Sequence, residues 1–113
     1  MTTEEKIRWL AEQAGWGPSE PHDGAFVWSR KVGDEYWYRY ALPDYPHSFD
    51  AIARDLLPLL WERGWRLDLW LDSELCQANV YDEGGWGKAR GDSTTPAAAA
   101  FEAIFEALHG ATE

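Results

Sequence analysis

The apolar residues of this chain change their spacing several times, and this succession of two periods most constrains the fold. Apolar residues recur every three or four positions, as on one face of a helix, in residues 3–14, 48–63 and 97–109. They alternate with polar residues, as in strands, in residues 25–30, 35–41, 65–72, 77–81 and 86–90. The succession predicts an α+β sandwich: a single domain over residues 1–113, with an antiparallel sheet of about five strands and helices on both faces.

Local signals at the helix ends support this assignment. Thr2 and Glu5 have the spacing of a capping box at the start of the first helix. Thr95 followed by Pro96 predicts an N-cap and a proline in the first turn of the last helix. Pro58 lies inside the middle helix, where it removes a backbone donor, so we expect a break there.

Glycines and prolines mark the connections. Residues 15–24 hold several of both and are expected to form an irregular loop, after Gly15 ends the first helix in a left-handed conformation. Residues 33–34 and 82–85 are expected to be hairpin turns, and Gly110 is expected to end the last helix.

The same periods predict the buried residues. In the second strand, Tyr36, Tyr38 and Tyr40 share one face, and Trp37 and Arg39 share the other. Both faces therefore carry aromatic rings, and we expect the sheet to be covered on both sides. The core is expected to include five residues on facing strand and helix surfaces: Leu67, Leu69, Phe101, Ile104 and Phe105.

Eight tryptophans in 113 residues supply more aromatic surface than one small core requires. Periodicity assigns about five of the eight to the core. The others are candidate contact residues, because an exposed tryptophan favours stacking on planar ligands and anchoring of protein partners.

Charge and cysteine content restrict the functional classes. The chain has 20 acidic and 10 basic residues, a formal net charge of −10, which disfavours direct nucleic-acid binding and anionic membranes but attracts a basic partner. A lone cysteine, Cys76, excludes an internal disulfide and a cysteine-cluster zinc site. The N-terminal residues lack the pattern of a signal peptide, and no apolar run is long enough to span a membrane, so we expect a cytoplasmic protein.

The order of short landmarks resembles the phage alpha-beta-alpha sandwich family, small proteins encoded in phage and prophage accessory regions. The landmarks are Ala-Gly-Trp at 14–16, Leu-Pro-Asp-Tyr at 42–45 before Ser48, Gly-Trp-Arg-Leu at 64–67, and residues 91–97 leading into an alanine-rich helix. The chain departs from the pattern in its tryptophan content, in Pro58 and in the 15–24 segment.

This resemblance implies a non-catalytic anti-defence protein that sequesters a nucleotide-type immune signal in a pocket formed by a homo-oligomer. A first alternative is an acidic inhibitor protein that binds a basic groove of a host defence nuclease or complex. A second alternative is a structural phage component.

A nucleotide-type ligand requires arginines for its phosphates, aromatic faces for its base and polar groups for its ribose. The candidate ligand-binding residues are Arg39, Arg54, Arg90, Asp92, Thr94, Trp37 and Trp86. Arg90 is of special interest because it precedes the amides that open the last helix, which attract anions. The alternative for each arginine is a surface ion pair, and helix capping alone also explains residues 93–96.

No enzyme motif emerges. His22, His47 and His109 are too scattered for a metal-ligand pattern. The carboxylates have no distinctive pairing, so we expect no catalytic residues, no metal and no cofactor.

Overall fold

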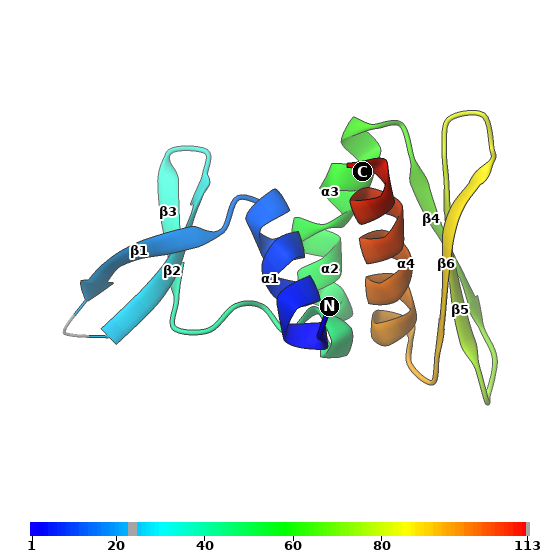
Figure 1. The fold of residues 1–113 in the computed structure, drawn as a ribbon, viewed down its shortest axis with the longest axis horizontal. Helices are drawn as coiled ribbons and strands as arrows, with labels where there is room; N and C mark the ends of the chain where they lie inside the picture. Colours follow the sequence, from blue (N-terminus) through cyan, green and yellow to red (C-terminus); the bar gives the residue numbers. More distant parts are fainter. Residues whose placement is uncertain (23–24, 113) are drawn as a thin grey trace. The chain divides into compact units, whose positions relative to one another are not determined.

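The computed structural model describes residues 1–22 and 25–112 of the chain (Figure 1). The chain divides into two compact units, Met1–Pro43 and Asp44–Glu113, here called unit 1 and unit 2. The described residues form an α+β fold with two antiparallel sheets of three strands each. The prediction of one sheet of about five strands is therefore wrong, because strands that are close in sequence pair only within their own unit.

Unit 1 consists of helix α1 (Thr3–Gln13) and strands β1 (Gly17–His22), β2 (Ala25–Val32) and β3 (Glu35–Arg39), paired in the order β1-β2-β3. The prediction of an irregular loop over 15–24 is wrong for Gly17–His22, which pairs antiparallel with β2. Two prolines in this segment disfavour a central strand, but β1 is an edge strand, where a missing amide donor is tolerated.

The predicted ends of α1 are confirmed. The Thr2 hydroxyl accepts a hydrogen bond from the Glu5 amide at 3.2 Å, and the Glu5 carboxylate accepts one from the Thr2 amide at 3.3 Å. Gly15 follows the helix with φ of +100°, a conformation that a residue with a Cβ rarely adopts.

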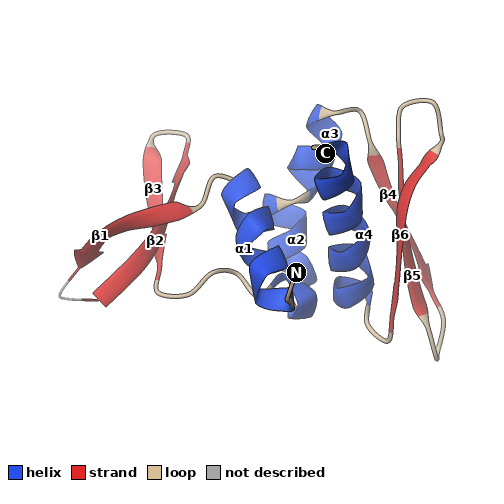
Figure 2. Cartoon of the chain, viewed as in Figure 1, coloured by secondary structure: helices blue, strands red, loops and turns tan. Residues whose placement is uncertain are grey.

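Unit 2 begins with a short 3₁₀ turn, η1 (Tyr45–His47), followed by helices α2 (Phe49–Asp55) and α3 (Leu57–Glu62). Strands β4 (Arg66–Leu71), β5 (Cys76–Tyr81) and β6 (Gly87–Ser93) come next and pair in that order, and helix α4 (Pro96–Ala111) ends the unit. The three helices lie on one side of this sheet (Figure 2). The sequence predicted helices on both faces of a single larger sheet, whereas the helices of unit 2 lie on one face of its three-stranded sheet.

Local signals also placed the helix boundaries of unit 2. The Ser48 and Thr95 hydroxyls cap α2 and α4 by accepting hydrogen bonds from Ala51 and Ala98. The expected break at Pro58 is confirmed, since α2 and α3 are separated at Leu56. The prediction that Gly110 ends the last helix is wrong: α4 continues through Ala111, and glycine is only a weak helix breaker without a left-handed turn.

The core of unit 2 lies between α4 and the inner face of the sheet. Phe101, Ile104 and Phe105 are buried as expected, and they face a sheet whose central strand buries Ala78 and Val80. Leu67 and Leu69 are only half-buried, which contradicts the expectation. Helix α4 packs mainly against β6 and β5, so that the edge strand β4 receives little cover.

Candidate functional site

Three tyrosines form an exposed ladder along β3 and the residues that follow it. Tyr36, Tyr38 and Tyr40 are 57, 52 and 72% exposed, respectively, although the sequence predicted that both faces of the hairpin were covered. Their spacing of two residues places them on the same face of an antiparallel sheet, about 7 Å apart along the strand. Unit 1 therefore presents a continuous aromatic strip, which we call the tyrosine ladder.

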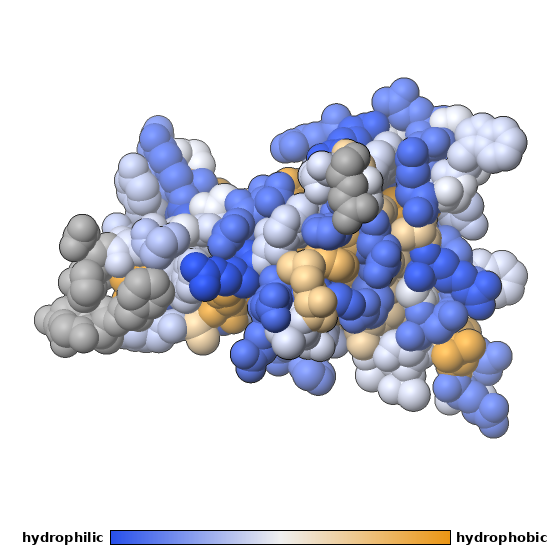
Figure 3. All heavy atoms as spheres, in the orientation of Figure 1, coloured by the Kyte–Doolittle hydropathy of each residue, from blue (hydrophilic) through white to orange (hydrophobic). Residues whose placement is uncertain are grey.

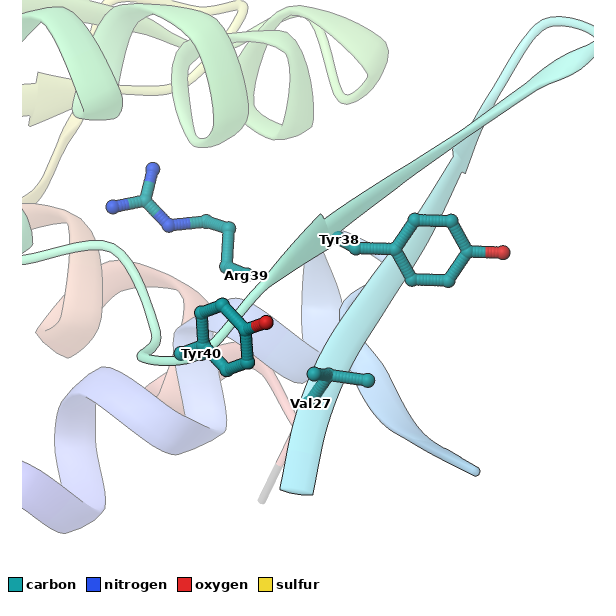
Figure 4. A pocket seen from close by; sticks show the side chains of 4 residues that line it. All are labelled: Val27, Tyr38, Arg39 and Tyr40. Carbon is teal, nitrogen blue, oxygen red and sulfur yellow. The ribbon is translucent and has the colours of Figure 1, made fainter. Parts of the chain in front are cut away.

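A small slot opens at one end of the tyrosine ladder. It has a volume of about 190 Å³ and is lined by Val27, Tyr38, Arg39 and Tyr40 (Figure 4). The buried Val27 of β2 contributes an aliphatic surface, and the two exposed tyrosines contribute aromatic ones. The slot is smaller than ordinary small-molecule pockets of about 300–1,000 Å³, so it can hold one ring or one apolar side chain.

The two candidate residues of unit 1 belong mainly to the opposite face of the hairpin. Arg39 points away from Tyr38 in Figure 4, and its Nε donates to the Ala41 carbonyl at 3.1 Å. Trp37 alternates with the tyrosines, so it too lies on the Arg39 face and is half-buried. The slot thus presents aromatic and aliphatic surface, with the guanidinium group of Arg39 directed elsewhere.

In unit 2, Arg90 and the first turn of α4 are not combined into an anion site. Gly91 faces α4 so closely that an added Cβ would lie 2.2 Å from the Ala99 carbonyl oxygen. Its neighbour Arg90 therefore lies on the outer face of the sheet, where its Nε forms an ion pair with Asp92 at 3.1 Å. Thr94, which is exposed, accepts a 3.8 Å hydrogen bond from Cys76 through its carbonyl.

Arg54 pairs with a carboxylate from its own helix. Its Nε and Nη2 donate to the two carboxylate oxygens of Asp55 at 2.6 and 2.9 Å. Asp55 is completely buried, and it also accepts a hydrogen bond from the Tyr45 hydroxyl at 2.9 Å. The hydrogen bond with Asp55 raises the pKa of the Arg54 guanidinium above its ordinary value. These hydrogen bonds connect η1 to α2. They also explain the position of the Arg54 side chain without a bound ligand.

Fewer tryptophans are buried than the sequence predicted. Among the tryptophans that the structure describes, only Trp16 is buried, while Trp61, Trp70 and Trp86 are 60, 72 and 76% exposed. Of the two candidate tryptophans, Trp86 is the more exposed. It lies in the β5–β6 turn, where its backbone amide donates to the Asp82 carboxylate at 3.0 Å. Trp86 is thus a candidate contact residue of unit 2, whereas the slot belongs to unit 1.

Acidic residues are concentrated in unit 2. Residues 44–113 contain thirteen acidic and five basic side chains, whereas residues 1–43 contain seven and five. Asp72 and Glu74 lie in the β4–β5 turn, and Asp82 and Glu83 lie in the β5–β6 turn. These turns are at opposite ends of β5, roughly 20 Å apart. The carboxylates therefore form two groups at the ends of the sheet.

Within the described residues 1–22 and 25–112, no group of three or more histidine, cysteine, aspartate or glutamate side chains is placed to hold a metal ion, and no helix has the length and apolarity of a membrane span. The expectation for the His22 side chain lies outside the described residues.

Comparison with models of protein families, with curated proteins and with solved structures found no match for this chain.

Sequence reasoning missed the tyrosine ladder as a site. The alternation of Tyr36, Tyr38 and Tyr40 predicts a shared face, but alternation alone does not distinguish a buried face from an exposed one. The hydroxyl on each ring was the available signal, because a phenol is compatible with water in a way that phenylalanine is not.

Proposed function

We propose that this chain is a non-catalytic binding protein that recognises a protein partner through the tyrosine ladder of unit 1. An extended, proline-containing segment of the partner lies along the ladder, and one apolar ring enters the slot between Tyr38 and Tyr40. The observation that carries this proposal is the slot itself: about 190 Å³ of space beside Val27, at the end of three exposed rings.

The chemistry of the slot favours a peptide over a whole nucleotide. Aromatic grooves are a common means of binding proline-rich segments, whose extended helix is preformed and loses little entropy. Tyrosine hydroxyls can also donate hydrogen bonds to the carbonyls of such a segment. A nucleotide would need a cation for its phosphates, and the guanidinium of Arg39 points away from the tyrosine face.

The biological setting we propose is the one that the landmark order implies: a phage or prophage accessory protein that interferes with host defence. The excess of acidic residues in unit 2 supports a partner with a basic surface, because opposite charges accelerate encounter. Lower salt should then raise the association rate, while the tyrosine contacts govern dissociation.

Titration of the full chain with immobilised extended peptides, with and without proline, tests the proposal. Tyr38→Ala and Tyr40→Ala each remove a wall of the slot, and each should weaken binding by about tenfold or more. Tyr36→Ala is the matched control, since Tyr36 belongs to the same ladder and is exposed but does not line the slot. It should weaken binding less than the other two substitutions.

Adenine nucleotides in the same titration separate the two ligand classes. If nucleotides bind and peptides do not, the original expectation of a sequestered nucleotide signal replaces the peptide proposal. If all three tyrosine variants bind a peptide as the parent chain does, the ladder is not the recognition surface.

A further inference from the structure

Strand β4 is an edge strand whose inner face is incompletely covered. It pairs with β5 on one side and with no other strand of unit 2 on the other. Leu67 and Leu69 are half-buried, and Leu71 is 65% exposed. Figure 3 shows hydrophobic surface near the β4–β5 turn. A hollow of about 370 Å³, lined by Trp70, Leu71, Asp72, Leu75 and Gln77, lies at the same end of the strand.

The backbone groups on the open side of β4 belong to the leucines. The Asp72 amide donates to the Leu75 carbonyl at 3.1 Å, in register with the β4–β5 ladder. Hydrogen-bonded pairs alternate in an antiparallel ladder, so Trp70, Asp68 and Arg66 direct their backbone groups towards β5. Leu67, Leu69 and Leu71 consequently direct their amides and carbonyls towards the open edge.

We propose that this edge pairs with β4 of a second copy of the chain, antiparallel and centred on Leu69. In this register Leu69 lies opposite its own copy, and Leu67 lies opposite Leu71. Each of these pairs can exchange two backbone hydrogen bonds, because all three leucines direct their backbone groups outward. The leucine side chains of the two copies then meet on the inner face and cover the surface that α4 leaves exposed.

Charge selects this register over its neighbours. Centring on Leu69 places Arg66 opposite Asp72 of the second copy, twice by symmetry, and Asp68 opposite Trp70. A shift of the centre to Asp68 places Asp68 opposite its own copy. A shift to Trp70 places Asp68 opposite Asp72. Like charges directly opposite destabilise a strand pair, so both shifted registers are disfavoured.

Sedimentation analysis of the full chain with charge variants tests the interface. Asp72→Arg replaces two attractive pairs by two repulsive ones and should weaken dimerisation by about tenfold. Glu74→Arg is the matched control: it makes the same charge change in the same exposed turn, outside the paired residues. Combining Asp72→Arg with Arg66→Asp restores opposite charges and should restore much of the dimer.

Cysteine cross-linking tests the register itself. In the proposed dimer the two Leu69 Cα atoms are about 5.5 Å apart, within the range for a disulfide. Leu69→Cys should therefore give a covalent dimer on mild oxidation, while the parent chain with its buried Cys76 should not. The two copies of Asp68 would be roughly 8 Å apart, too far for a bond, so Asp68→Cys should remain monomeric on the same gel.

Three results would overturn the proposal. The first is a parent chain that sediments as a monomer at every concentration. The second is equal dimerisation of the Asp72→Arg and Glu74→Arg variants. The third is cross-linking through Asp68→Cys in place of Leu69→Cys, which would require a different register. Thermal unfolding of each variant checks that a lost dimer does not reflect a lost fold.

Discussion

Replacing Gly91 by alanine adds a single methyl group, and we expect this change to destabilise unit 2 measurably. Gly91 lies in β6, is buried, and packs directly against α4. An added Cβ would lie 2.2 Å from the Ala99 carbonyl oxygen and 2.8 Å from the Ala103 amide nitrogen. Both neighbours are backbone atoms of a helix, so they cannot rotate away. The strand or the helix must move to accommodate even one methyl group.

The expected change in the free energy of unfolding of the Gly91→Ala variant is the difference between two opposing effects. Overpacking a tight interior contact costs about 1–3 kcal/mol and more where the backbone must shift. Alanine also restricts the unfolded chain relative to glycine, which contributes about 0.4–1 kcal/mol of stability. Because the clash is deep, we expect Gly91→Ala to lower the free energy of unfolding of unit 2 by about 2 kcal/mol.

Gly87→Ala provides the internal control. Gly87 lies in the same strand, but no heavy atom would lie within 4 Å of an added Cβ. This variant should be neutral or slightly more stable than the parent chain. Chemical denaturation followed by circular dichroism, together with hydrogen exchange of the α4 amides, would measure the difference. If Gly91→Ala and Gly87→Ala unfold at the same midpoint, the close approach of β6 and α4 is incorrect.

Three further changes test other parts of the fold. Phe101→Ala removes a buried ring from α4 and should lower the free energy of unfolding by about 3–5 kcal/mol, measured by the denaturation midpoint. Tyr45→Phe removes the hydroxyl that donates to the buried Asp55, and should cost about 1.5–3 kcal/mol in the same assay. The hydrogen bonds from Thr2 lower the pKa of Glu5 below its ordinary value of 4.5. The stabilisation from Glu5 is therefore present above that value and is lost as the pH falls through the lower folded pKa; an NMR titration of the Glu5 carboxyl and of the α1 amides should show this, and Glu5→Gln should abolish the pH dependence.

Features that depend on neighbouring residues were determined by the sequence. The Thr2–Glu5 capping box, the N-cap at Thr95, the break at Pro58 and the left-handed Gly15 all occur where the sequence predicts them. Each involves residues within about one helical turn of one another, so the sequence near that position is sufficient to specify it.

Features that depend on contacts between residues far apart in the sequence were decided by the tertiary structure. Alternation showed that Tyr36, Tyr38 and Tyr40 share a face and that Leu67 and Leu69 share another, but it could not show whether anything covers those faces. The tyrosines are exposed, and the leucines are half-buried because α4 packs mainly over β5 and β6. Likewise, the predicted strand ends at residue 90, before Gly91, and only the structure shows that Gly91 lies in β6 and in close contact with Ala99. The period of the apolar residues in the sequence determines which way each side chain points from its own backbone. Whether that side chain is buried depends on which other segments of the chain pack against it.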